Sequence, residues 1–138
     1  MEVPEAIAFW NMKAKNEDDY ACFMKERIQN EMNCLSSTKS ELYDLVYLHD
    51  NGNIEKKLFT RGNECVTIIN KCLISLLELC ELLKEKNIKS KEMTIPVEFI
   101  MNYKKGFYDK LHNELCSFTE SKIYEGKKIE NYLEESLI

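Results

Sequence analysis

Residues 58–83 read LFTRGNECVTIINKCLISLLELCELL, and this stretch decides the fold. Small and apolar residues recur in it at alternating spacings of four and three, which is typical of a helix packed lengthwise against its neighbours. This first row consists of Leu58, Gly62, Cys65, Ile69, Cys72, Leu76, Leu79 and Leu83. A second row beside it consists of Val66, Leu73, Leu77 and Cys80. Because a helix with two such rows meets neighbours on more than one side, we predict the central helix of a bundle.

Turn and capping signals before this stretch predict a second long helix. Asn16 is followed by three acidic residues, a pattern that favours a helix start because the first backbone N–H groups are unpaired. We expect this helix over 17–49, with a weak point at 36–38, where hydroxyl groups compete for backbone partners. Asn-Gly readily adopts positive φ, so residues 50–53 predict a turn. The central helix then runs over 54–86, with Gly62 as a bend or a site of close helix approach.

Weaker patterns complete the predicted architecture. A short helix is expected over 4–15, because a proline near its start suits a first turn. A lysine-rich loop over 87–93 leads to a third long helix over 94–118, which opens with a Thr-x-Pro signal. Helicity weakens over 119–126, and apolar residues at helical spacing predict a short helix over 127–138. The fold class is therefore all-α, an antiparallel bundle of three long helices with short N- and C-terminal helices.

Length and composition favour a single helical domain, residues 1–138, in which 119–138 forms a peripheral tail helix. The chain has 138 residues, four Gly and two Pro, and strand-rich folds need more turn residues than this. The net charge of −5, with acids and bases interspersed, argues against direct nucleic-acid binding. The most apolar stretch, 65–83, carries three charged side chains, so no membrane span is expected.

The six cysteines are interpreted as free thiols rather than as a disulfide framework. Three of them lie on the two apolar rows, where a thiol behaves as a small buried hydrophobe. The chain begins without the pattern of a secretory signal. We therefore expect an intracellular protein, cytoplasmic or nuclear. A secreted four-helix cytokine-like ligand with paired cysteines is the alternative.

No group of residues predicts catalysis, a metal or another cofactor. His112 and Cys116 are four residues apart on one predicted helix, but a nucleophilic thiol also needs an oxyanion site, which mid-helix residues do not easily supply. Cys65, Cys72 and Cys80 are spread along one helix over up to about 22 Å, too far for one ion. We expect no enzyme activity and no small-molecule substrate.

The predicted role is a non-enzymatic interaction module or complex subunit that acts through its helical faces. The candidate partner-binding residues are Phe9 and Trp10 near the N-terminus and Tyr103 with Phe107 on the last long helix, because aromatic side chains dominate interface energetics. The hypothesis is a groove or end, formed by these two helices, that binds a helix of a protein partner. A viral apoptosis or signalling modulator with a compact helical fold is a further alternative.

Three short segments resemble the helical domain of GINS replication subunits. Residues 61–65, Arg-Gly-Asn-Glu-Cys, are similar to a helix opening in that domain. Glu98-Phe99, with Tyr103 and Phe107 after it, resembles an acidic-aromatic pattern on a late helix, and Asn16-Glu17-Asp18 stands in a similar place before the long helix. The resemblance covers about Glu5 to Phe118, and the small β-domain of that family has no counterpart after it. It implies a non-catalytic subunit of a helicase-activating complex in DNA replication.

Overall fold

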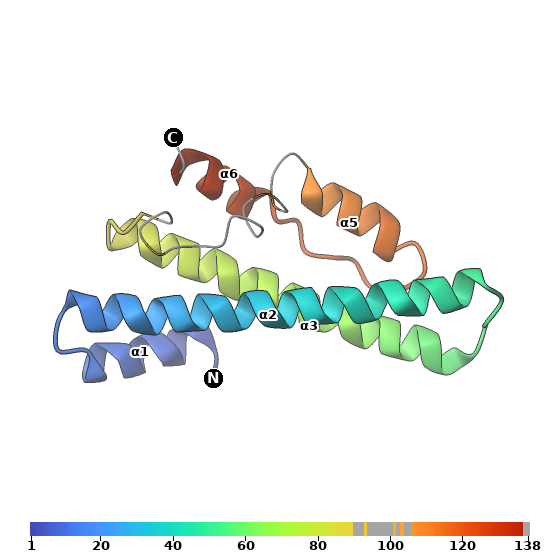
Figure 1. Ribbon diagram of the computed structural model, residues 1–138, viewed down its shortest axis with the longest axis horizontal. Helices are drawn as coiled ribbons and strands as arrows, with labels where there is room; N and C mark the ends of the chain where they lie inside the picture. The colour runs from blue at the N-terminus through green and yellow to red at the C-terminus, as the bar shows by residue number, and fades with distance from the viewer. Residues whose placement is uncertain (90–92, 94–100, 102, 104–105, 137–138) are drawn as a thin grey trace.

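The chain folds into helices arranged around one long helical hairpin (Figure 1). The computed structural model describes residues 1–89, 93, 101, 103 and 106–136. Within those residues it contains five helices and no strand. The all-α prediction is confirmed, and the long helices number two over the same part of the chain.

Helices α2 (Glu17–Asp50) and α3 (Lys56–Glu85) pack antiparallel and form the hairpin. The Asn16 side chain caps α2 by accepting a hydrogen bond from the Asp19 N–H at 2.9 Å, as predicted. The turn lies where Asn-Gly predicts it, and Gly52 has φ +96°. The weak point expected at 36–38 does not interrupt the helix, because α2 continues through these residues with Thr38 buried.

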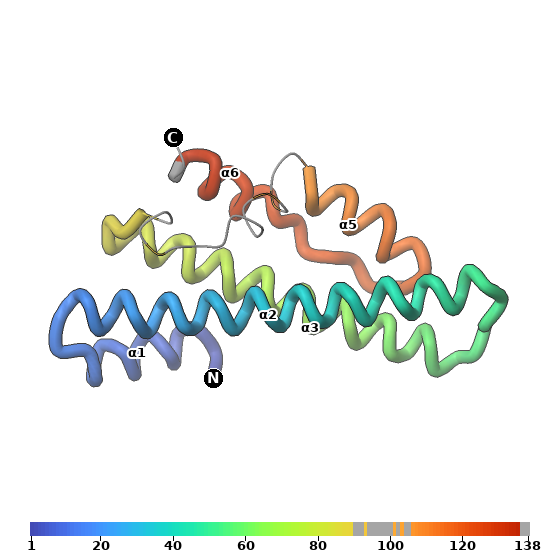
Figure 2. The backbone as a smooth tube through the Cα atoms, in the orientation of Figure 1, coloured from blue at the N-terminus to red at the C-terminus, as the bar shows by residue number. Residues whose placement is uncertain are grey.

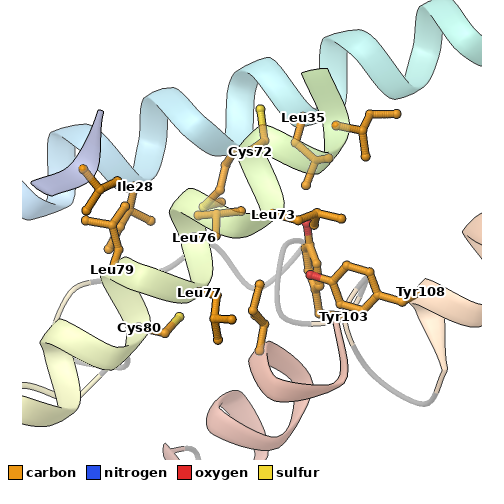
Figure 3. Close-up of a cluster of buried hydrophobic side chains, with 14 of the residues drawn as sticks. Ile28, Leu35, Cys72, Leu73, Leu76, Leu77, Leu79, Cys80, Tyr103 and Tyr108 are labelled. Carbon is orange, nitrogen blue, oxygen red and sulfur yellow. The ribbon is translucent and has the colours of Figure 1, made fainter. Parts of the chain in front are cut away.

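The two apolar rows of α3 form the centre of the core (Figure 3). Every member of both rows is buried. In Figure 3 the side chains of Cys72 and Leu76 extend toward α2, while Leu77 and Cys80 lie on the side of Tyr103. The prediction that α3 is covered on more than one side is confirmed.

Helix α1 (Val3–Lys13) packs against α2 and α3, and α6 (Lys127–Ser136) packs against another side of α3. Val3, Ala6 and Trp10 are buried under α1, and Ile129 and Leu133 are buried under α6. The chain reverses between α1 and α2 and again between α2 and α3, so α1 and α3 run in parallel directions (Figure 2).

The predicted third long helix is corrected by the structure at Gly106. This residue has φ +77°, a left-handed conformation that glycine adopts without strain, and α5 (Phe107–Leu115) begins after it. One helix therefore does not run unbroken over 94–118. The predicted start at Thr94 and Pro96 lies outside the described residues, as does Glu98-Phe99.

The connection between α5 and α6 is fastened to α3 by two asparagines. The Asn63 side-chain oxygen accepts hydrogen bonds from the N–H groups of Glu120 and Ser121, each at 3.1 Å. Asn70 donates to the carbonyl of Lys122 at 2.8 Å and accepts from the N–H of Tyr124. The predicted loss of helix over 119–126 is confirmed, and these bonds pair several backbone groups of the connection with α3.

Two glycines allow aromatic rings to approach the backbone closely. A Cβ on Gly62 would lie 2.7 Å from the Phe118 ring, so what approaches Gly62 closely is a ring of the α5–α6 connection rather than the neighbouring helix that the sequence suggested. A Cβ on Gly126 would lie 2.0 Å from the Tyr108 ring. The first contact holds the C-terminal third of the chain against α3, and the second joins α5 to the residue that precedes α6.

Candidate functional site

One face of α1 is exposed although it carries large apolar side chains. Glu5, Ala8, Phe9 and Met12 follow helical spacing, so they share this face, which we call the α1 outer face. Phe9 is 45% exposed and Met12 is 82% exposed. A helix with apolar residues all round is normally covered on every side. The α1 outer face therefore has the character of a contact surface.

The opposite face of α1 holds the helix in place. Trp10 stands edge-on to Tyr20 of α2, with ring centroids 5.8 Å apart. At the other end of α1, the Arg27 guanidinium donates to the backbone carbonyl of Met1 at 2.6 Å. Because both ends are tied to α2, the α1 outer face points away from the hairpin.

Carboxylates gather near the N-terminal end of α1. We call Glu2, Glu78 and Glu81 the acidic flank. Burial, and then the negative charges of Glu2 and Glu81, raise the pKa of the Glu78 carboxyl, while the nearby Arg27 acts in the opposite direction. With Glu5 on the α1 outer face, this end of the surface favours a positively charged neighbour.

The first two candidate partner-binding residues are adjacent in sequence but differ in exposure. Phe9 lies on the α1 outer face, with the Lys13 ammonium 5.9 Å from its ring centroid. Trp10 is only 6% exposed and closes the core beneath α1. Phe9 therefore offers exposed surface for contact, whereas Trp10 offers almost none.

The other two candidates, Tyr103 and Phe107, lie together beside the start of α5. Their ring centroids are 5.1 Å apart, and Tyr103 is buried. The Lys39 ammonium of α2 lies 5.1 Å from the centroid of the half-buried Phe107 ring. Trp10 contacts α2 at Tyr20, whereas Phe107 contacts α2 at Lys39, much farther along the helix. The four candidates therefore form two separate groups. The hypothesis of one groove between α1 and the helix of Phe107 is corrected accordingly (Figure 1).

Two clefts accompany the ends of the shorter helices. One, of about 540 Å³, lies between the α1–α2 turn and the end of α3, and Asn11, Asn16, Tyr20 and Lys86 are among its lining residues. The other, of about 450 Å³, lies between α3 and α5. Its lining carries both signs of charge, from Asp109, Lys122, Glu125 and Lys127.

The surroundings of Cys116 do not favour a nucleophilic thiol. Its sulfur accepts a hydrogen bond from the Ile123 N–H at 3.2 Å. Burial raises the pKa of the Cys116 thiol, which disfavours the thiolate that nucleophilic chemistry requires. His112 lines the cleft between α3 and α5. The arrangement is that of a packing residue beside a rim histidine.

The three cysteines of α3 serve as packing residues. Cys65 donates to the Glu41 carboxylate at 3.5 Å, and burial is the largest cause that raises its pKa to about 11. Burial likewise raises the pKa of Cys80 to about 12. All six cysteines are free thiols. Across the described ranges, no group of three or more His, Cys, Asp and Glu residues is placed to hold a metal ion.

Met12 belongs to the α1 outer face but was not among the predicted partner-binding residues, because only aromatic residues were selected. The signal was present, because Ile7, Phe9, Trp10 and Met12 point to different sides of one helix. Four large apolar residues spread around eleven helical residues exceed what one buried face can cover. A helical projection of 3–13 would have shown that apolar residues lie all round the helix, and the structure shows which of its sides is exposed.

Comparisons with protein-family models, with curated proteins and with solved structures give no match to this chain. In the part of the chain that the structure describes, no helix is both long and apolar enough to cross a membrane.

Proposed function

We propose that this protein is a non-enzymatic interaction module or complex subunit, and that the α1 outer face docks a helix of a protein partner. The observation that carries the proposal is the exposure of Phe9 and Met12 on a helix whose other face is already buried. Removing such side chains from water on association is favourable by about 25 cal/mol per Å² of apolar area. Helix-in-groove recognition uses apolar anchors at this kind of spacing.

The charges around the surface define the partner. Glu5, together with the acidic flank, places negative charge at the N-terminal end of the apolar patch. A complementary helix carries apolar side chains opposite Phe9 and Met12, with Lys or Arg beside them. An anionic lipid surface is disfavoured by the same carboxylates. A basic amphipathic helix is therefore the occupant we propose.

A synthetic amphipathic helical peptide, with leucines on one face and lysines beside them, tests this directly. We expect the full chain to bind it in a calorimetric titration, with affinity that falls as salt increases. The double variant F9S/M12S should lose at least about tenfold in affinity, the scale expected for interface hot spots. The same peptide with glutamates in place of its lysines should bind much more weakly.

The matched control is the double variant L48S/I54S. Leu48 and Ile54 are 43% and 78% exposed, and they lie at the far end of the hairpin from α1. This variant should bind the lysine peptide like the unaltered chain. Equal losses in both double variants, or equal binding of both peptides, would contradict the proposal. Sedimentation that shows a dimer dissociated by F9S/M12S would identify a second copy of the chain as the occupant instead.

The remaining alternatives from the sequence stay predictions. These are a GINS-like replication subunit, a viral apoptosis or signalling modulator and a secreted cytokine-like ligand.

A further inference from the structure

The turn between α2 and α3 carries an Asn-Gly pair that is open to water. Asn51 follows the last residue of α2, and both Asn51 and Gly52 are exposed at the end of the hairpin farthest from α1 (Figure 1). A Cβ placed on Gly52 would meet nothing within 4 Å. Gly52 is also the only glycine in the sequence that follows an asparagine. The pair is therefore accessible to solvent and distinct from every other asparagine in the chain.

Two hydrogen bonds hold this pair against the last turn of α2. The Asn51 side-chain amide donates to the Tyr47 carbonyl at 2.8 Å. The Gly52 N–H donates to the His49 carbonyl at 3.0 Å. The Asn51 side chain and the Gly52 nitrogen, which can react with each other, are thus both engaged elsewhere.

The backbone at Asn51 also keeps these two groups apart. To form a ring with the Asn51 side chain, the Gly52 nitrogen must lie on the same side of the Cα–C bond as the Asn51 Cβ. At the observed ψ of 19° the nitrogen points well away from this Cβ. The peptide between the two residues must therefore rotate before they react, and this rotation breaks the hydrogen bond from the Gly52 N–H to His49.

We propose that Asn51 is a spontaneous modification site, which water converts to aspartate and isoaspartate, and that the closed turn holds this reaction back. Asparagine is one of the thermolabile residues of proteins. The free energy needed to open a structure locally varies from one region to another, and exposed turns lie at its low end. The modification therefore marks molecules in which the turn between α2 and α3 has opened.

The first step takes place once the turn is open. The Gly52 nitrogen attacks the Cγ carbon of Asn51, and a Cγ–N bond forms while the bond between Cγ and Nδ2 breaks. The side-chain nitrogen leaves as ammonia and carries away the proton lost from the Gly52 nitrogen. Glycine suits this step because it has no Cβ to crowd its nitrogen. The product is a cyclic imide that joins the two residues.

In the second step water opens the imide at either of its carbonyls. Attack at Cγ breaks the bond from Cγ to the Gly52 nitrogen and leaves aspartate at position 51. Attack at the main-chain carbonyl carbon leaves isoaspartate, in which the chain continues through the side chain. Overall, one water is consumed and one ammonia is released, and nothing is oxidised or reduced.

Peptide mapping of the full chain, incubated native or unfolded in urea at mildly alkaline pH, tests the site. Trypsin cuts after Lys39 and Lys56, so Asn51 lies in peptide 40–56. We expect aspartate and isoaspartate forms of this peptide in the unfolded chain. In the native chain they should form at least about tenfold more slowly, because two hydrogen bonds must break first. A synthetic peptide of residues 47–55, incubated with and without urea, corrects for any effect of urea on the chemistry itself.

Two variants assign the reaction to its residue. Because Asn53 shares the tryptic peptide, fragmentation must place the change at Asn51. N51Q should remove the modified forms, since glutamine has to close a larger ring, whereas N53Q should react like the unaltered chain. Equal rates in the native and unfolded chains would overturn the proposal. It would also be overturned by aspartate without isoaspartate, or by another asparagine that reacts before Asn51.

The variant N51D measures what the modification does to the hairpin. A carboxylate at this position cannot donate to the Tyr47 carbonyl, and it adds negative charge beside Asp50 at the C-terminal end of α2, where the helix carbonyls are already negative. N51D should therefore lower the midpoint of heat denaturation by about 2 °C or more.

The matched control is N53D, which adds the same charge two residues later. The Asn53 side chain acts as an acceptor, from the Glu55 N–H at 3.1 Å, and a carboxylate can accept the same bond. N53D should therefore leave the midpoint unchanged or raise it. An unchanged midpoint in N51D, or an equal fall in both variants, would show that the Asn51 amide does not hold the turn closed and would contradict the proposal.

Discussion

Helices α3 and α1 are both rich in apolar side chains, yet they differ in how much of that surface is covered. Over 30 residues α3 exposes one large apolar side chain, Ile74, whereas α1 exposes two, Phe9 and Met12, over 11 residues. Among the pairs of helices with substantial contact, α3 packs against α2, α1 and α6. In the same set α1 packs only against α2 and α3, which lie on one side of it. The difference indicates that apolar content alone does not locate the core, because coverage depends on which elements the chain brings back.

The largest expected effect comes from the covered helix. Leu76→Ala removes a side chain that is 1% exposed and leaves a cavity between α3 and α2. We expect a loss of about 3 kcal/mol in the free energy of unfolding, measured by urea denaturation. Ile74→Ala, at a 42% exposed position of the same helix, is the matched control and should cost less than about 1 kcal/mol. Similar losses at both positions would contradict the difference in burial between Leu76 and Ile74.

The next effect concerns the cover that α5 and α6 provide. Gly126→Ala places a Cβ within 2.0 Å of the Tyr108 ring, so we expect a loss of about 2 kcal/mol from overpacking. Gly52→Ala meets nothing within 4 Å, but its φ of +96° predicts a loss of about 1 kcal/mol from backbone strain. In double-mutant cycles, adding Tyr108→Leu should recover part of the loss caused by Gly126→Ala. It should recover none of the loss caused by Gly52→Ala.

A smaller effect distinguishes the carboxylate of Glu78, near α1, from that of Glu41, which pairs α2 with α3. The folded pKa of Glu78 is raised, so its contribution is present at low pH and is lost as pH rises through that pKa. The stability of the unaltered chain relative to Glu78→Gln should therefore fall as pH increases from about 4 to about 6.

Glu41 provides the opposite case. A hydrogen bond from Arg61 is the main cause that lowers its pKa, so its contribution is present at neutral pH and is lost as pH falls through the folded pKa. Relative to Glu41→Gln, the unaltered chain should lose stability on acidification below about pH 4.5. Urea midpoints over this range check both signs, and slopes of the same sign at both positions would contradict the assignments.

The smallest effect on stability is expected at the α1 outer face. Met12→Ser alters a side chain that is 82% exposed, so the free energy of unfolding should change by no more than about 0.5 kcal/mol. Trp10→Ala, on the covered face of the same helix, should cost about 3 kcal/mol. If Met12→Ser cost as much as Trp10→Ala, the outer face would already be covered within the chain.

Much of the hairpin could be predicted from local patterns. The spacing of the two apolar rows of α3 correctly predicted that all their members are buried. It could do so because the position of a residue along a helix fixes the face on which its side chain lies. Asn16 and the Asn-Gly turn marked helix ends for equally local reasons, since capping and positive φ are properties of a few neighbouring residues. The exposure of the candidate aromatic anchors was harder to predict. Phe9 and Trp10 are adjacent large aromatic residues, and which of them is buried depends on the helices that pack against α1.

Errors arose where neighbouring elements change a local preference. The hydroxyl residues 36–38 suggested a break, but packing against α3 keeps α2 continuous there. The helix predicted over 94–118 includes Gly106, yet the left-handed conformation of this residue precedes the start of α5. The contacts of Gly62 with Phe118 and of Gly126 with Tyr108 join residues far apart in sequence or separated by a turn.

The sequence by itself determined that this protein is helical, that residues 58–83 form its most buried helix and that an Asn-Gly turn precedes that helix. These follow from periodicity and backbone chemistry, which act over a few residues. Only the tertiary structure decided that α1 buries Trp10 and exposes Phe9 and Met12, and that Asn63 of α3 binds the backbone of the α5–α6 connection. Such pairings depend on how distant segments return to one another, and the energy that selects among these arrangements belongs to the whole core rather than to any one stretch.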